Sequence, residues 1–260
     1  MKKKEIFYKV ADIIRAVNGK PSCRFTSAII VAAGNSTRMG GGISKQMALL
    51  DNMPVVVRTL RAYQQSPEIS EIIVVAREDE IAYYEEFKEK YRLTKLAHVV
   101  RGGIDRQESV LNGLKKVREH AGYVAIADGA RCLITPEMIG KVCRSAYQFG
   151  GASAACRVVD TVKVADANGF IKSTEDREKI WLAQTPQVFK LNVYRAAAYS
   201  AMEKGFKATD DNSLVERIHR RVKLVDCGQD NLKITTQEDL IRAQTVLRTR
   251  REMAERGDFE

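Results

Sequence analysis

A loop rich in glycine and serine follows the apolar run Ala28–Ala33 and carries two cations, Arg38 and Lys45. Glycine lets the main chain come close to a ligand, so the N–H groups of such a loop can surround phosphate oxygens while the cations neutralise them. The loop matches neither standard phosphate motif. A Walker loop that begins at Gly34 would need a glycine where Met39 stands, and a dinucleotide-binding fingerprint that begins at Gly40 would need a glycine where Lys45 stands. The residues indicate an anion-binding loop, and a structural turn with incidental charges stays open as the alternative.

A second candidate binding loop contains two consecutive glycines, Gly102 and Gly103. It leads into a helical pattern whose first turn holds Arg106 and Ser109. Glycines permit a close backbone approach, and the N-terminus of a helix favours an anionic or polar ligand group. Asp105 occupies the position of a helix cap, so a purely structural role is the alternative. Capping and ligand binding are compatible with each other.

Three later segments carry charged side chains where strands or helices are expected to begin or end. Asp128 closes an apolar run and Arg131 follows three residues later, an arrangement that ordinary turns also show. The segment Thr-Asp-Asp at 209–211 opens a helix, and either of its first two residues would serve as a cap. Lys233 stands between leucine and isoleucine in an expected strand, where a lysine is costly to bury unless it meets an anion.

The elements that position these loops follow from the alternation of apolar and helical patterns. Strand-like runs at 28–33, 71–76, 97–100 and 123–128 alternate with helical patterns at 54–65, 80–91 and 106–120. This alternation predicts an α/β fold with a mainly parallel sheet and helices on both faces. Ligands bind beyond the carboxyl ends of such strands, so the loops after Ala32, Val100 and Ala127 are expected to converge.

The second half of the chain has a different pattern. A strand is expected at 152–159, and the alternating segment after it contains Asn168-Gly169, which is typical of a β-hairpin turn. We expect this hairpin, at about 160–180, to form a protruding arm. Exposed hairpins often pair with a second subunit, and a simple surface flap is the alternative. A last strand at 222–225 and a basic helix from about Gln237 complete the prediction.

Length and composition limit the classes of protein. With 260 residues, 45% of them hydrophobic, the chain can bury a full core, and we expect an amphipathic helical extension at 1–25 followed by one domain at 26–260. The net charge of +10 would attract anionic ligands such as nucleotides, nucleic acid or a membrane surface, and it does not choose among them. No window approaches the roughly 18 apolar residues of a membrane span.

Cysteine and histidine usage argues against a disulfide framework and against a dedicated histidine-metal site. The five cysteines are an odd number without a CxxC pair, which fits a reducing cytosol. None of the three histidines stands three or four residues from another. We expect a cytoplasmic protein without membrane contact.

Eight segments in a fixed order make the chain similar to one enzyme family. They are AAGxxxRMG, KQ, GGxxRxxSVxxGL, DGAR, DTVK, DRxxxWxxQTPQ, TDD and NLKIT, within about residues 26–244. Each segment is weak alone, but the ordered set resembles the 2-C-methyl-D-erythritol 4-phosphate cytidylyltransferase family. The resemblance implies a Rossmann-like fold of the nucleotide-diphospho-sugar transferase type, with a mainly parallel mixed sheet and a protruding β-arm.

The resemblance also implies an activity, the transfer of a cytidylyl group from CTP to 2-C-methyl-D-erythritol 4-phosphate with release of pyrophosphate. The catalytic residues that it implies are Arg38, Lys45 and Lys233. The CTP-binding residues that it implies are Ala32, Ala33, Gly34, Gly103, Ser109 and Asp128. The acceptor-phosphate residues that it implies are Arg131, Thr161, Arg177 and Thr209, with Thr161 and Arg177 supplied by the arm of a partner subunit. It further implies a homodimer and Mg²⁺ bound mainly through the CTP phosphates.

The chain departs from the family pattern at three positions. Ser36 replaces a glycine, Ala127 replaces a histidine and Cys132 replaces a proline. Without the proline, the loop that aims Arg131 should be looser. The charged positions are retained, so activity is expected.

Two alternatives remain at this point. A ribitol 5-phosphate cytidylyltransferase would share the loops and differ in the acceptor pocket, although DREKIWLAQTPQ and DTVK look more like the methylerythritol enzyme. A non-catalytic protein that binds nucleic acid on the same scaffold would fit the charge. However, no basic face interleaved with aromatic residues supports nucleic-acid binding, and we expect none.

Overall fold

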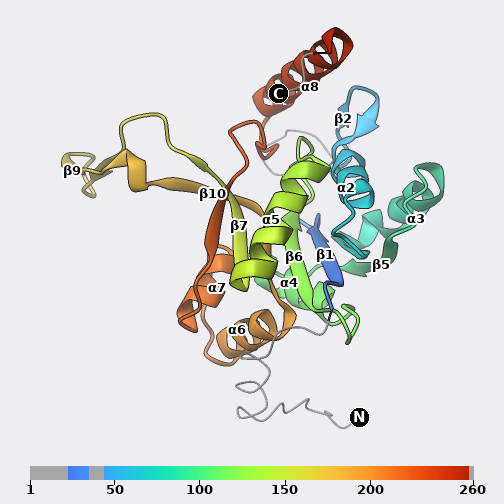
Figure 1. The fold of residues 1–260 in the computed structure, drawn as a ribbon, viewed down its shortest axis with the longest axis horizontal. Coiled ribbons are helices and arrows are strands. Elements are labelled where there is room, and N and C mark those ends of the chain that lie inside the picture. Colours follow the sequence, from blue (N-terminus) through green and yellow to red (C-terminus); the bar gives the residue numbers. More distant parts are fainter. Residues whose placement is uncertain (1–22, 35–43, 258–260) are drawn as a thin grey trace.

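The structure is a computed structural model that describes residues 23–34 and 44–257 (Figure 1). Arg38, Ser36 and nearly all of the expected N-terminal helix lie outside the described residues. The elements in chain order are β1 (Thr26–Val31), β2 (Leu49–Leu50), β3 (Met53–Pro54), α2 (Val55–Gln65), β4 (Glu71–Ala76), η1 (Glu78–Glu80), α3 (Ile81–Lys90), β5 (Leu96–Arg101), α4 (Arg106–Leu114), β6 (Tyr123–Asp128), α5 (Pro136–Phe149), β7 (Gly151–Arg157), β8 (Lys163–Ala165), β9 (Ile171–Thr174), η2 (Arg177–Lys179), β10 (Trp181–Lys190), α6 (Leu191–Glu203), α7 (Asp211–Arg217), β11 (Lys223–Asp226) and α8 (Gln237–Arg256).

A seven-stranded sheet in the order β11-β7-β10-β6-β1-β4-β5 forms the centre of the fold. The neighbours β6, β1, β4 and β5 are parallel, as are β7 and β11. β10 runs antiparallel between β6 and β7. Nearly every residue of β1, β4 and β6 is buried, as expected for strands covered on both faces. The predicted α/β fold with a mainly parallel sheet is confirmed.

Helices pack on both faces of this sheet (Figure 1). One layer contains α2, α3 and α5, with the buried aromatic residues Tyr63 and Tyr84. The opposite layer contains α4, α6 and α7, with Val110 and Tyr194 in its core. A third, smaller apolar cluster packs α8 against Leu50 of β2, Cys132 in the loop after β6 and Ile234. Among the described residues, no helix combines the length and the apolar character that crossing a bilayer would require.

Two local predictions are wrong. The helix predicted at 106–120 ends at Leu114, because the buried carboxylate of Glu71 accepts hydrogen bonds from Arg118, at 3.2 Å from its main-chain N–H and 3.1 Å from its Nε. Lys233 does not lie on a strand: its segment runs beside the loop after β6, joined to it by the Ile234 N–H, which donates to the Ala130 carbonyl at 2.9 Å. Local pattern could not reveal either of these distant partners.

The predicted hairpin is confirmed, and Figure 1 shows it as an arm that extends away from the sheet. β8 and β9 pair with each other and with no other described strand. The arm carries exposed apolar side chains, among them Phe170 at 72% exposure and Ile171 at 66%. Large apolar groups in that position favour a protein contact.

Candidate active site

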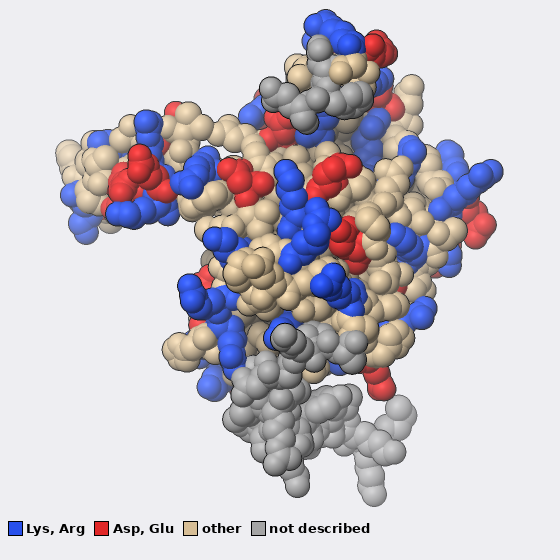
Figure 2. All heavy atoms as spheres, in the orientation of Figure 1, with Lys and Arg blue, Asp and Glu red and all other residues tan. Residues whose placement is uncertain are grey.

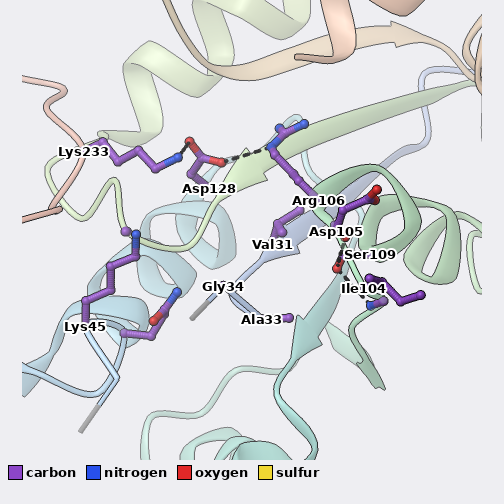
Figure 3. A pocket seen from close by; sticks show the side chains of 13 residues that line it. Val31, Ala33, Gly34, Lys45, Ile104, Asp105, Arg106, Ser109, Asp128 and Lys233 are labelled. Carbon is purple, nitrogen blue, oxygen red and sulfur yellow. Dashed lines mark hydrogen bonds and ion pairs between the residues drawn. The ribbon is translucent and has the colours of Figure 1, made fainter. Parts of the chain in front are cut away.

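A cavity of about 300 Å³ lies at the carboxyl ends of the central strands, where the loops after β1, β5 and β6 meet (Figure 3). The predicted convergence of these loops is therefore confirmed. The candidate residues that line the cavity are Ala33, Gly34, Lys45, Gly103, Ser109, Asp128 and Lys233. Gln46, Ile104, Asp105 and Arg106 also line it. The cavity thus combines open main-chain segments with lysines that come from two distant parts of the sequence.

The loop after β5 is organised by its own hydrogen bonds. Asp105 caps α4, and its Oδ1 accepts from the Glu108 N–H at 2.9 Å, as the structural alternative predicted. The Ser109 hydroxyl accepts from the Gly103 N–H at 3.0 Å and donates to the Asp105 carbonyl at 2.8 Å. Ser109 is 3% exposed. Its hydroxyl therefore shapes the loop that faces the cavity, in addition to lining it.

Asp128, at the end of β6, is a buried carboxylate with three cations of the described residues around it, and Figure 3 shows two of them, Lys233 and Arg106. Its Oδ2 lies 2.9 Å from Lys233 Nζ and 3.7 Å from Arg131 Nε, and its Oδ1 lies 3.6 Å from Arg106 Nε. Burial alone would raise the pKa of Asp128, but Lys233, Arg106 and Arg131 together lower this pKa below its ordinary value. Asp128 is therefore ionised at neutral pH, and this part of the cavity has excess positive charge.

Arg106 is held between two carboxylates. Its Nη2 lies 2.7 Å from Oδ2 of Asp211, whose side chain is only 2% exposed. The hydroxyl of Tyr194 donates to the other oxygen, Oδ1, at 2.5 Å. Burial would lower the pKa of Arg106, but Asp211 and Asp128 raise this pKa above its ordinary value. Arg106 is therefore a permanent cation. The sequence placed Arg106 in the first turn of its helix but gave no indication that Asp211 is its partner.

A short part of β10, Gln184–Gln187, braces the loops that form the site. The Thr185 hydroxyl accepts from the Asp128 N–H at 3.0 Å. The Gln187 side-chain oxygen accepts from two N–H groups at the start of α7, each at 3.0 Å. The Gln184 side-chain oxygen accepts from Asn231 Nδ2 at 2.9 Å, next to the segment of Lys233. These residues belong to a motif of the sequence, but the motif does not reveal that they hold the loops in place, because each contact joins distant parts of the chain.

Arg131 is fixed beside the cavity but is absent from its lining. Its Nη1 donates to the Asn231 carbonyl at 2.5 Å, and its side chain is 12% exposed. Cys132, which replaces the family proline, is buried in the third apolar cluster, and burial raises the pKa of its thiol to about 11. The loop is therefore held by the packing of Cys132 in this cluster and by the hydrogen bond from Arg131 to the main chain of Asn231.

Four other candidates lie apart from the described lining of the cavity. Ala32 is fully buried behind it. Thr209 precedes α7, and its hydroxyl lies 3.3 Å from Ser213 Oγ. Thr161 and Arg177 belong to the arm, where Arg177 donates to the Val159 carbonyl at 2.8 Å. The described lining of the cavity therefore lacks three of the expected acceptor-phosphate residues, Thr161, Arg177 and Thr209.

Comparison with known proteins identifies one family. The family model described as 2-C-methyl-D-erythritol 4-phosphate cytidylyltransferase matches residues 26–249. Proteins of that name from Caldanaerobacter subterraneus subsp. tengcongensis and Geobacter metallireducens are 44% and 42% identical, over 85% of this chain and 98% and 97% of theirs. The solved structure of 4-diphosphocytidyl-2C-methyl-D-erythritol synthase from Anaerococcus prevotii has a TM-score of 0.76 at 32% identity, over 86% of this chain and 98% of that one. The chain therefore belongs to the 2-C-methyl-D-erythritol 4-phosphate cytidylyltransferase family.

Proposed function

We propose that this protein transfers the cytidylyl group of CTP to 2-C-methyl-D-erythritol 4-phosphate, forming 4-diphosphocytidyl-2-C-methyl-D-erythritol and pyrophosphate. The observation that carries the proposal is the cavity in Figure 3, which brings Lys45 and Lys233 together beside the open main chain of Ala33 and Gly34. The family match over residues 26–249 supports the choice of substrates.

The reaction is a direct displacement at phosphorus. A phosphate oxygen of the acceptor attacks the α-phosphorus of CTP, and the bond to the β-phosphate breaks to release pyrophosphate. Such a step requires in-line positioning and cations that neutralise the phosphoryl oxygens, with little covalent participation by protein. We assign the neutralising role to Lys45 and Lys233, and to Arg38 by resemblance. The main chain of Ala33 and Gly34, with Gly103, would hold the cytidine. Ala32 would act only by supporting this loop, because its own N–H donates to the Val75 carbonyl at 2.7 Å.

The site suits magnesium that arrives with the nucleotide. Within residues 23–34 and 44–257, no group of three or more histidine, cysteine or acidic side chains is placed to hold a metal ion. Asp128 and Asp105 are the carboxylates in the cavity lining, and Asp128 is already matched by three cations. We therefore propose that the CTP phosphates supply most of the Mg²⁺ ligands, and the ion would neutralise phosphate charge.

We also propose a homodimer in which the arm of one subunit completes the acceptor site of the other. Support comes from the exposed apolar residues of the arm, and from Thr161 and Arg177 being absent from the described lining of the cavity. A cytoplasmic location is part of the proposal, since all five cysteines are free thiols.

Surface charge gives the nucleic-acid alternative little support. Figure 2 shows lysine and arginine side chains on the arm and across the body, interleaved with aspartate and glutamate. On this face, the described residues form no continuous basic track of the kind that follows a phosphate backbone. On this face, the basic side chains of the described residues are thus dispersed among acidic ones.

A coupled assay of pyrophosphate release tests the proposed function. With CTP and Mg²⁺, we expect turnover with 2-C-methyl-D-erythritol 4-phosphate at least about tenfold faster than with ribitol 5-phosphate, because specificity resides in the acceptor pocket. A preference for ribitol 5-phosphate would contradict the choice of acceptor. Absence of turnover with either, together with salt-sensitive RNA binding, would favour the non-catalytic alternative.

Replacing Gly102 by alanine is expected to raise the KM for CTP by about tenfold and to cost about 1–3 kcal/mol of stability, because the new methyl group overpacks the site. A Cβ at this position would lie 2.3 Å from the Cβ of Ala33 and 3.2 Å from Ser109 Oγ, so the loop after β1 must shift. Urea unfolding and steady-state kinetics measure the two effects. Gly34→Ala is the matched control for stability, because a Cβ there meets no atom of the described residues within 4 Å.

A further inference from the structure

Asp211 is a buried carboxylate that has no role in the displacement reaction proposed for this site. Its two oxygens are occupied by Arg106 Nη2 at 2.7 Å and by the Tyr194 hydroxyl at 2.5 Å. Its own N–H donates to the Gln187 side-chain oxygen at 3.0 Å. Asp211 is therefore fixed through both its side chain and its main chain, and it fixes the Arg106 guanidinium in turn.

The ion pair with Asp211 determines which anion the Arg106 guanidinium faces. The Arg106 side chain is 31% exposed and lines the cavity, so a free guanidinium would be able to turn toward a phosphate group. With Nη2 held by Asp211, its Nε instead lies 3.6 Å from Asp128 Oδ1. Arginine presents its donors in a planar fork, so fixing one nitrogen orients the others.

The three cations around Asp128 differ in how firmly they are held. Arg106 is tied to Asp211, and Arg131 is tied to the Asn231 carbonyl at 2.5 Å. Lys233 is the most exposed of the three, at 37% for its side chain against 31% and 12%. Lys233 can therefore leave Asp128 for a phosphate oxygen while two fixed cations continue to compensate the carboxylate.

We propose that Asp211 is a positioning residue that retains Arg106 as the permanent counter-ion of Asp128, so that Lys233 is the cation of this group that transfers to the substrate phosphates. The inference rests on the proposed function, because it requires a polyphosphate ligand in the cavity. Asp211 acts through Arg106 and does not touch the substrate itself.

The variant Asp211→Asn tests the inference, because it keeps the size of the side chain and removes the negative charge that holds Arg106. We expect CTP and pyrophosphate to bind about threefold to tenfold more tightly, since a freed guanidinium can pair with phosphate oxygens in the ground state. We expect kcat to fall by about tenfold, because Asp128 then loses one of its two fixed counter-ions and holds Lys233 more firmly. Isothermal titration and steady-state kinetics measure the two changes. A purely structural role would lower thermal stability without tightening the binding of either ligand.

A second variant and a matched control separate the possible causes. In Asp211→Asn combined with Arg106→Gln, the released charge is absent, so binding should return to the wild-type level or become weaker. Glu71→Gln is the control: Glu71 is also a buried carboxylate, 2% exposed, with Arg118 Nε at 3.1 Å, but it lies at the amino end of β4. Glu71→Gln should lower the melting temperature and leave CTP binding and kcat unchanged.

The outcomes distinguish this inference from the proposed function. Binding by Asp211→Asn that is unchanged or weaker would overturn the inference, even if the wild-type enzyme is fully active. Failure of the wild-type protein to release pyrophosphate would instead overturn the proposed function. Should Asp211→Asn not fold, Tyr194→Phe removes one hydrogen bond to the same carboxylate. It should then give a smaller shift in the same direction, and an unchanged affinity would overturn the inference.

Discussion

Replacing Lys233 by methionine is expected to lower kcat for cytidylyl transfer by about 10²–10³-fold, the usual range for removing one group that stabilises charge in a transition state. The lysine ammonium lies 2.9 Å from Asp128 and lines the cavity, at a position from which it can move to a phosphate oxygen. Methionine retains most of the aliphatic stem, so the loss is mainly one of charge. The fold should persist, because Arg106 and Arg131 still compensate Asp128. Stopped or quenched time courses of pyrophosphate release measure the effect.

A control must separate loss of this charge from loss of any partly buried lysine. Lys95 suits that purpose, since its Nζ donates to the Ser66 carbonyl at 2.8 Å and it precedes β5, at the amino ends of the strands. Lys95→Met should retain wild-type kcat even if it unfolds at a lower temperature. Lys45→Met should resemble Lys233→Met in kcat. If Lys233→Met kept more than about half of the wild-type kcat, the mechanism with two lysines would be wrong.

The central sheet and its loops could be predicted because the information is local. The runs at 28–33, 71–76 and 123–128 are apolar enough to be strands buried on both faces, and helical patterns separate them. Parallel strands place their carboxyl ends at one edge, so the convergence of Gly34, Gly103 and Asp128 follows from topology. The glycines and charged residues of each loop mark it as a candidate binding loop, even without knowledge of the other loops that it contacts.

The rest of the site depends on contacts that local pattern does not encode. The sequence marked the Gln184–Gln187 segment as a motif, but only its antiparallel place between β6 and β7 explains why it braces Asp128. Likewise, Arg106 and Asp211 are about a hundred residues apart in the sequence. A position in the first turn of a helix is enough to account for Arg106, and a place in a helix-capping segment is enough to account for Asp211, so neither residue points to the other. Lys233 was expected to need an anion, which is correct, and that anion is the carboxylate of Asp128.

A heterodimer of two inactive variants is expected to recover about half of the wild-type activity if the arm completes the site of a partner subunit, because one of its two sites is then intact. One subunit would carry Lys45→Ala in the cavity, and the other would carry Arg177→Ala in the arm. Each variant alone should lose at least about 10²-fold in kcat, since one phosphate-binding cation is missing from both sites. Co-expression with two different affinity tags isolates the heterodimer, and pyrophosphate release measures its activity.

The matched control combines Lys45→Ala with Lys233→Ala on separate subunits. Both lysines line the same cavity, so each site of this heterodimer lacks one of them and no activity should return. Recovery in the first pair and not in the second requires that Arg177 serve the opposite subunit. If the first pair stayed inactive, Arg177 would act within its own subunit, and full activity of Arg177→Ala alone would remove the arm from the site. The exposed Phe170 and Ile171 on the arm would then need a different partner surface.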